Sequence, residues 1–249
     1  MEAPETAGQD VLVLGGTGAT GQRLVRLLLE RGVGVRVTVR SAQRLPEDVR
    51  EHPRLAVTEA SLLDLGGADL ARHVNGVRGV ASCLGHTLSF AGIYLPPRRL
   101  VSEAVRRICQ ALAEREAQPP GRFVLMNTTG VRNHDLRESV SLAQRAVLGI
   151  LRVAVPPHAD NEQAAEVLRV EIGPGHPCVQ WVAVRPDGLH ELEQVTPYTL
   201  HPSPTRSAIF DAGKTSRLNV AHFMAELLTD DATWARWQGR MPVIYDAPD

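Results

Sequence analysis

The stretch Gly15-Gly16-Thr17-Gly18-Ala19-Thr20-Gly21 decides the fold of this chain. It follows the apolar run Val11-Leu12-Val13-Leu14, which predicts a buried parallel strand, and it precedes leucines at helical spacing. Gly15 makes the tight turn off the strand, Gly18 lets the backbone approach a phosphate, and Gly21 lets the helix pack closely on the sheet. A glycine-rich turn between a strand and a helix is typical of a dinucleotide-binding βαβ unit.

The start of the following helix supplies further donors for phosphate oxygens. The backbone N–H groups from Ala19 to Gly21 have no partner within a helix, and the helix dipole adds positive charge there. Thr17 and Thr20 add hydroxyl groups to the same loop. We therefore predict a pyrophosphate-binding loop, with a plain glycine turn of another α/β fold as the alternative.

Strand-like and helix-like segments alternate along the rest of the chain. Strands are predicted at 33–39, 55–58, 79–83, 123–126, 178–184 and 241–245, and helices at 100–117, 136–154, 160–172 and 219–229. This alternation predicts an α/β fold with a doubly wound parallel sheet (Rossmann fold), as a single domain over 1–249. Three prolines and few apolar residues within 188–215 predict a small C-terminal substrate lobe or lid within that domain.

The end of the second predicted strand distinguishes between two dinucleotides. An acidic residue there would bind the ribose 2′-hydroxyl of NAD and repel the 2′-phosphate of NADP. This chain has Arg40 and Ser41 instead, followed by Arg44. A planar guanidinium suits a phosphate, so we predict NADP(H), with a solvated strand-end charge as the alternative interpretation of Arg40.

Composition excludes several other classes of protein. The 249 residues carry a net charge of -1 without long blocks of like charge, so neither nucleic acid nor an anionic membrane is expected as a partner. No apolar run reaches the length of a membrane span, and the first nine residues lack the apolar core of a secretory signal, so we expect a cytoplasmic protein. The cysteines and histidines lack metal-ligand spacing, so no metal is expected.

Five short motifs together resemble a known family. They are GGTGATG at 15–21, VTVRS at 37–41, ASCLG at 81–85, NTTG at 127–130, and the pair Arg185-Pro186. This set resembles the atypical short-chain dehydrogenases/reductases. The closest branch is the NAD(P)H-binding, NmrA-like group that includes flavin reductases of the biliverdin reductase B type.

The resemblance implies contacts to the cofactor beyond the glycine loop. Ser61 and Leu62 would lie by the adenine, Leu84 and Gly85 by the adenosine and the nicotinamide ribose, and Pro186 and Asp187 by the nicotinamide. Thr128 would occupy the place of the active-site serine, next to the cofactor. Many relatives carry an aspartate where this chain has Ser61.

The main departure from the superfamily concerns the proton donor. Its main branch uses a Tyr-x-x-x-Lys pair, whereas the residues four positions after Tyr94, Tyr198 and Tyr245 are Arg98, Pro202 and Asp249. The helix register places Pro157 and Asn161 near the expected positions of the pair. A tyrosine general acid is therefore not available at its usual place. Flavin reductases of the resembling group also lack the pair, which favours a planar, easily reduced acceptor.

Two functions remain open at this point. The first is an NADPH-dependent reductase of a small conjugated acceptor of flavin, quinone or enone type, in which Thr128 orients the acceptor and His86 or water supplies the proton. Both side chains also have plainer interpretations, Thr128 as a satisfied strand-end hydroxyl and His86 as a loop histidine. The second function is a non-catalytic NADP(H) sensor with a protein partner. An isomerase or epimerase is disfavoured, because those enzymes also depend on the tyrosine.

Overall fold

The computed structural model describes residues 10–86, 98–115, 119–136, 138 and 141–247. Eight strands form one sheet in the order β3-β2-β1-β4-β5-β6-β10-β8. The bounds are β1 Asp10–Leu14, β2 Val35–Val39, β3 Leu55–Glu59, β4 Val77–Ser82, β5 Gly121–Met126, β6 Val179–Pro186, β8 Tyr198–His201 and β10 Val243–Asp246. All neighbours are parallel except β8, which is antiparallel to β10. The short strands β7 (Gly188–His190) and β9 (Lys214–Ser216) pair separately.

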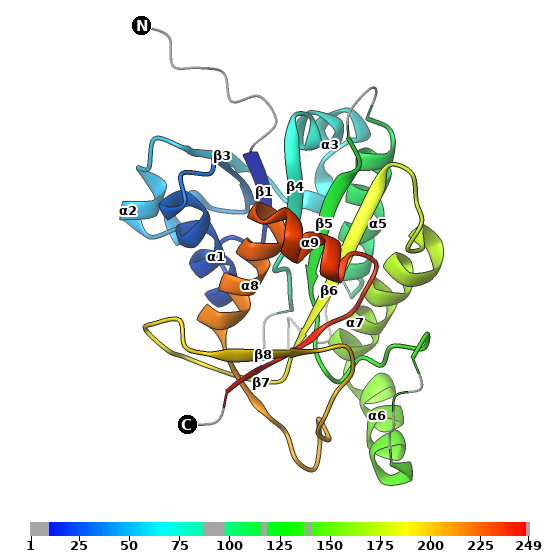
Figure 1. Cartoon of the computed structure of the whole chain (residues 1–249). Coiled ribbons are helices and arrows are strands. Elements are labelled where there is room, and N and C mark those ends of the chain that lie inside the picture. The colour runs from blue at the N-terminus through cyan, green and yellow to red at the C-terminus, as the bar shows by residue number, and fades with distance from the viewer. Residues whose placement is uncertain (1–9, 87–97, 116–118, 137, 139–140, 248–249) are drawn as a thin grey trace, which may run out of the picture.

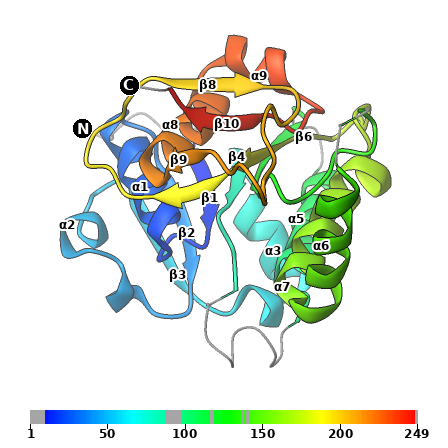
Figure 2. The same cartoon turned by 90° about the horizontal axis from the view of Figure 1, so that it is seen from below.

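Helices cover both faces of the sheet, as Figures 1 and 2 show. The longer ones are α1 Ala19–Glu30, α3 Gly67–Val74, α5 Leu100–Ala113, α6 Leu142–Ala154, α7 Pro156–Glu166 and α8 Arg217–Thr229. Shorter helices are η1 Ala42–Arg44, α2 Glu47–Arg50, η2 Leu62–Asp64 and α9 Asp231–Trp237, and α7 runs on into the π-helical turn η3, Val167–Ile172. Helices α1 and α8 pack together on one face, and α3, α5 and α7 on the other. This arrangement confirms the predicted doubly wound α/β fold.

Strand β1 shows why the central strands are apolar at every position. Val11 and Val13 belong to the buried cluster that includes α1 and α8, while Leu12 and Leu14 belong to the cluster on the α5 side. Side chains alternate between the faces of a sheet, so a strand covered on both faces is apolar throughout. The strand order reverses between β1 and β4, which forms the topological switch point where such sheets bind ligands.

Several elements differ from the sequence-based expectations. Helix α7 begins at Pro156 rather than at Asp160, because proline is well accommodated in the first turn of a helix. Strand β8 lies within the segment expected to be a loop, and its hydrogen bonds run to β10 rather than to a neighbour in sequence. Helices α2, α3 and α9 were not predicted.

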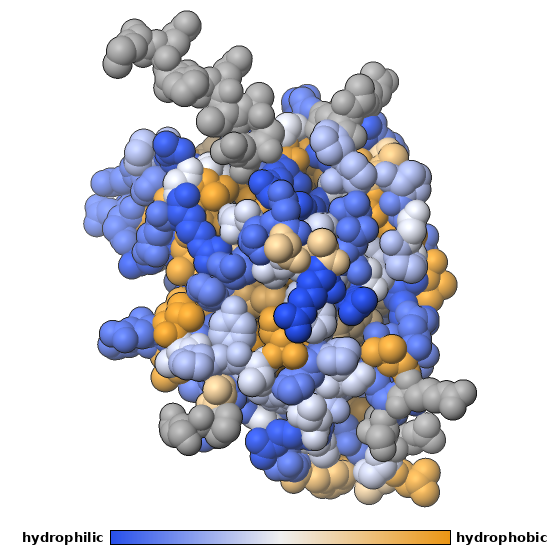
Figure 3. Space-filling model, in the orientation of Figure 1, coloured by the Kyte–Doolittle hydropathy of each residue, from blue (hydrophilic) through white to orange (hydrophobic). Residues whose placement is uncertain are grey.

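The surface in Figure 3 mixes hydrophilic and apolar side chains. In the part of the chain that the structure describes, the most exposed large apolar side chains are Leu142 and Ile150, both on α6. Among the described residues, no helix is both long and apolar enough to span a membrane.

Candidate functional site

The predicted site residues gather along one edge of the sheet. Residues 15–21 follow β1, Arg40 follows β2, Ser61 follows β3 and Leu84 follows β4. Thr128 follows β5, while Pro186 ends β6 and Asp187 comes next. Because these strands are parallel, all of these residues lie beyond the carboxyl ends, where open α/β sheets bind their ligands.

Glycines shape the loop after β1 through close backbone contacts. Gly15 has a φ of 73°, and a Cβ on it would lie 2.6 Å from the carbonyl oxygen of Cys83. A Cβ on Gly21 would overlap the carbonyl oxygen of Gly15. The amide of Gly18 donates to that same oxygen at 2.9 Å, which closes the turn. Only glycine fits at positions 15 and 21 without displacing the backbone.

The amino end of α1 fits a bound anion. The N-cap residue is Gly18, whose lack of a side chain leaves the first amides of the helix uncapped, and the first turn holds no acidic residue. Gln22 donates from its amide to the carbonyl oxygens of Thr17 and Arg44, both at 3.1 Å, and so joins this loop to the turn after β2. The loop could therefore hold the pyrophosphate of a dinucleotide, which would supply hydride chemistry at this edge when bound.

The turn after β2 carries two exposed arginines. Neither the Arg40 nor the Arg44 guanidinium makes a hydrogen bond or an ion pair with any other described residue. The nearby Glu59 carboxylate accepts from the backbone amide of Ala42 at 2.5 Å, and Ser41 donates to Gln43 at 2.6 Å. The two uncompensated positive charges are suited to an anionic group such as a 2′-phosphate.

The turns after β3 and β4 complete the cofactor half of the edge. Leu62 is buried and packs in the cluster on the α5 side, with Leu84 partly buried against it. Gly85 is exposed. Burial raises the pKa of the preceding Cys83 thiol to about 12, so this cysteine is a packing residue rather than a thiolate nucleophile.

The turn after β5 places Thr128 beside the end of β6. The Thr128 hydroxyl accepts from the amide of Gly130 at 3.2 Å, and the amide of Thr129 donates to the carbonyl of Pro186 at 3.0 Å. The side-chain amide of Asn127 donates to the carbonyl of Asn161 at 3.0 Å, which joins this turn to α7. Thr128 is thus held beside Pro186, while its hydroxyl proton is not used in the bond to Gly130.

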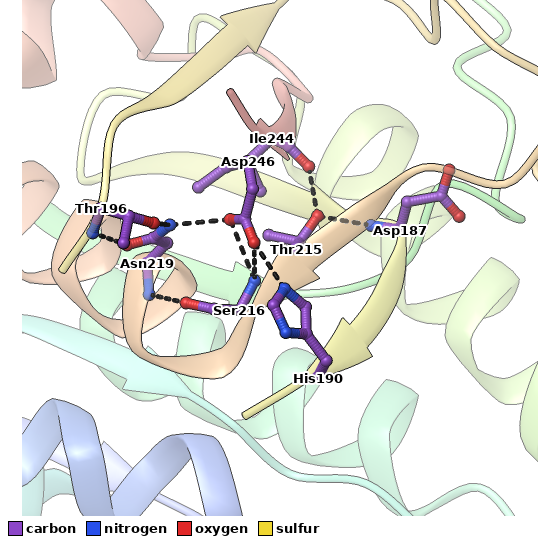
Figure 4. A network of polar contacts seen from close by, with 8 residues as sticks. All are labelled: Asp187, His190, Thr196, Thr215, Ser216, Asn219, Ile244 and Asp246. Carbon is purple, nitrogen blue, oxygen red and sulfur yellow. Dashed lines mark hydrogen bonds and ion pairs between the residues drawn. The ribbon is translucent and has the colours of Figure 1, made fainter. Parts of the chain in front are cut away.

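A polar network fixes Asp187 and the strands that follow it (Figure 4). The hydroxyl of Thr215 accepts from the amide of Asp187 and donates to the carbonyl of Ile244. The carboxylate of Asp246 accepts from His190, the amide of Ser216 and the side chain of Asn219. These bonds tie β7, β9 and the start of α8 to β10.

His86 lies against a buried carboxylate. Its Nε2 is 2.8 Å from Asp160 Oδ2, and its side chain is 6% exposed. Asp160 also accepts from the amides of Val101 and Ser102 and from the Ser102 hydroxyl. The carboxylate therefore caps the start of α5 from a different helix, a function that the sequence pattern did not reveal because it placed Asp160 at the start of its own helix.

His158 lies beside the candidate site, and the sequence did not point to it. It lies in the first turn of α7, and a Cβ on Gly130 would lie 3.4 Å from its ring atom Cε1 and 3.7 Å from the Thr128 hydroxyl oxygen. Pro157 and Asn161 were expected near this position. Burial lowers the pKa of His158, while Glu162 at 3.5 Å acts in the opposite direction. The early start of α7 at Pro156 is the signal that would have placed this ring at the turn after β5.

A separate groove of about 430 Å³ lies at the opposite edge of the sheet. Its lining includes Arg31, Arg78 and Glu226. Arg31 pairs with Glu226 at 2.6 Å, so part of its charge is internally compensated. The groove is remote from the switch point and adds nothing to the site there.

Comparison with known proteins agrees with this architecture. The chain matches the model of an NAD(P)H-binding family over residues 15–231. No curated protein matches it significantly.

Solved structures share the fold at low sequence identity. A short-chain dehydrogenase/reductase (wide type) from Veillonella parvula, in complex with NADP, superposes with a TM-score of 0.69 at 18% identity, over 96% of this chain and 94% of that one. An anaerobilin reductase from Escherichia coli O157:H7 gives 0.66 at 16% identity, over 96% and 100%. A proposed NADH-flavin reductase from Streptococcus pneumoniae gives 0.64 at 17%, also over 96% and 100%.

The matched range begins at the glycine-rich loop 15–21 (the glycine cradle) and includes β4 beside the switch point. Since that match spans most of the sequence, this chain belongs to the NAD(P)H-binding family.

Proposed function

We propose that this protein is an NADPH-dependent reductase of a small conjugated acceptor of flavin, quinone or enone type. The observation that carries the choice of NADPH is the pair of exposed arginines after β2, Arg40 and Arg44, neither of which has a carboxylate partner among the described residues. A solvated anion with three acceptor oxygens would neutralise them, whereas a ribose hydroxyl would not. The NADP-bound neighbour is consistent with this choice, whereas the two neighbours named as reductases support only the class of reaction, since one of them is named for NADH.

The remaining residues at this edge of the sheet bind the dinucleotide or orient the acceptor. The cradle and the start of α1 bind the pyrophosphate, with Thr17 and Thr20 at its sides. Ser61, Leu62, Leu84 and Gly85 line the adenosine side, and Pro186 and Asp187 line the nicotinamide side. Thr128 donates its hydroxyl proton to a carbonyl or ring nitrogen of the acceptor, and a histidine at this edge or water completes the reduction with a proton.

The absence of a Tyr-x-x-x-Lys pair is the reason for choosing a conjugated acceptor. A secondary alcohol or unactivated ketone needs a positioned acid to balance the charge on its oxygen. Flavins, quinones and enones spread that charge over a conjugated system, so orientation next to the nicotinamide is the main requirement.

The test is oxidation of NADPH, followed at 340 nm, with FMN, menadione and 2-cyclohexenone as acceptors. We expect turnover with at least one of them, and slower turnover with NADH. Tight binding of NADPH without turnover of any acceptor would overturn the reductase proposal and favour an NADP(H) sensor with a protein partner.

A further inference from the structure

We infer that His158 is the proton donor to the acceptor, in a recess formed by Thr128, Gly130 and His158 (the acceptor recess). This inference rests on the proposed reductase function and assigns a catalytic residue within it. The recess is defined by one measurement: a Cβ on Gly130 would lie 3.4 Å from the His158 ring atom Cε1 and 3.7 Å from the Thr128 hydroxyl oxygen. The His158 ring and the Thr128 hydroxyl therefore border the same backbone position, where Gly130 has no side chain to separate them.

The two nitrogens of the His158 ring have different surroundings. Nε2 is buried, makes no hydrogen bond and lies 3.5 Å from Glu162 Oε1. Nδ1 would lie 3.8 Å from the same Cβ on Gly130, and no hydrogen bond to it is found among the described residues. The nitrogen on the side of the recess is thus the one left to meet a ligand.

Charged neighbours orient the ring without engaging Nδ1. Glu162 lies one helical turn further along α7, and its other oxygen accepts from Arg152 of α6 at 2.5 Å. From the turn after β5, the uncharged Thr128 and Gly130 lie beside the ring. Asp160, also on α7, is already bonded to His86 and to the start of α5. This arrangement favours His158 over His86 as the donor, because His86 is committed to a capping carboxylate.

The chemical step balances with one proton and one hydride. NADPH gives a hydride to the electrophilic atom of the acceptor and is oxidised to NADP⁺. The Nδ1–H bond of the His158 imidazolium breaks, and its proton joins the nitrogen or oxygen at the other end of the conjugated system. The neutral ring then regains a proton from water, and Thr128 holds the acceptor through its hydroxyl throughout.

The direct test is His158→Gln, with His134→Gln as the matched control because His134 is an exposed histidine in the loop after β5. We expect kcat/KM for FMN or menadione to fall about a hundredfold in His158→Gln, as expected for a lost general acid. The Kd for NADPH should change less than about threefold, which shows that the fold is intact. The control should retain the activity of the wild type.

The pH profile separates proton donation from a merely structural contribution. A donor must be protonated, so wild-type kcat/KM should fall as the pH rises through the pKa of His158, which burial holds below its usual value. That dependence should disappear in His158→Gln. In Gly130→Val, a side chain would fill the recess, so KM should rise while NADPH binding is retained.

Two results would overturn the inference, and they differ from each other. If the wild type turns over an acceptor and His158→Gln has the same rate and pH profile, then His158 takes no part in the reaction. The reductase function would remain in place. No turnover by the wild type would remove the function itself and the inference with it.

Discussion

The two halves of the sheet edge are built by different means. From β1 to β4 the phosphate-binding loop is made of backbone, with glycines and helix amides that lie close together in sequence, and the arginine side chains beside it come from the next turn along the chain. From β5 onward it is made of side chains that reach across the chain, such as Asp160 to the start of α5 and Asp246 to Ser216. The first half suits the dinucleotide, which stays the same, whereas a few substitutions in the second half can change which acceptor binds there.

The largest expected effect is on the free energy of unfolding, when the buried cation Arg185 at the end of β6 is removed from the second half of the edge. Arg185 is fully buried, pairs with Glu138 at 2.8 Å and donates to the carbonyls of Met241 and Val131. Arg185→Met leaves the Glu138 carboxylate buried without its partner, so the free energy of unfolding in urea should fall by about 3–5 kcal/mol.

The exposed pair of Arg106 and Glu171 provides the control. Arg106→Met should cost about 1 kcal/mol or less, since water screens that pair. Equal losses in the two variants would show that the burial of Arg185 contributes nothing of its own.

The next largest effect should fall on the cradle of the first half. The Cβ introduced by Gly21→Ala overlaps the carbonyl of Gly15, so the turn must shift and the NADPH Kd should rise about a hundredfold. Gly67→Ala adds the same atom to the first turn of α3, where nothing lies within 4 Å. It should leave binding unchanged, and a similar loss in both variants in a fluorescence titration would contradict a specific cradle.

A smaller effect should reveal which dinucleotide the first half selects. Arg40→Asp removes a guanidinium and adds a charge that repels a phosphate, so the NADPH Kd should rise about tenfold while the NADH Kd stays within about twofold. Arg240→Asp, which makes the same exchange at an exposed side chain beside β6, is the control. Equal losses of NADPH and NADH in Arg40→Asp would remove the proposed contact.

The smallest effect concerns the pH dependence of stability that arises from His222, which packs against β8. Burial, followed by the charge of Arg31, lowers the pKa of His222, whose ring is 3.0 Å from the Tyr198 hydroxyl. A lowered folded pKa means that the unfolded chain binds more protons, so stability falls as the pH drops below about 6.5. His222→Gln should lose less stability than the wild type between about pH 7 and pH 5.5 in thermal unfolding, and an identical pH slope would contradict this explanation.

The same contrast explains which features the sequence could predict. The cradle was predictable because a strand, a glycine turn and a helix are consecutive, and the doubly wound α/β fold was predictable from the alternation of strands and helices. His158 was missed because the capping-box pattern at Asp160 suggested a helix start there, whereas Pro156 opens α7 a full turn earlier. Strand β8 was missed because its partner β10 lies more than forty residues away. Such long-range pairing leaves no local pattern.

The most direct test of the account is a parallel titration of the wild-type protein with NADPH and NADH, followed by the fluorescence of the reduced nicotinamide. NADPH should bind at least about tenfold more tightly than NADH, because only its 2′-phosphate can meet the two uncompensated arginines after β2. Equal affinity for the two dinucleotides, or tighter binding of NADH, would contradict it.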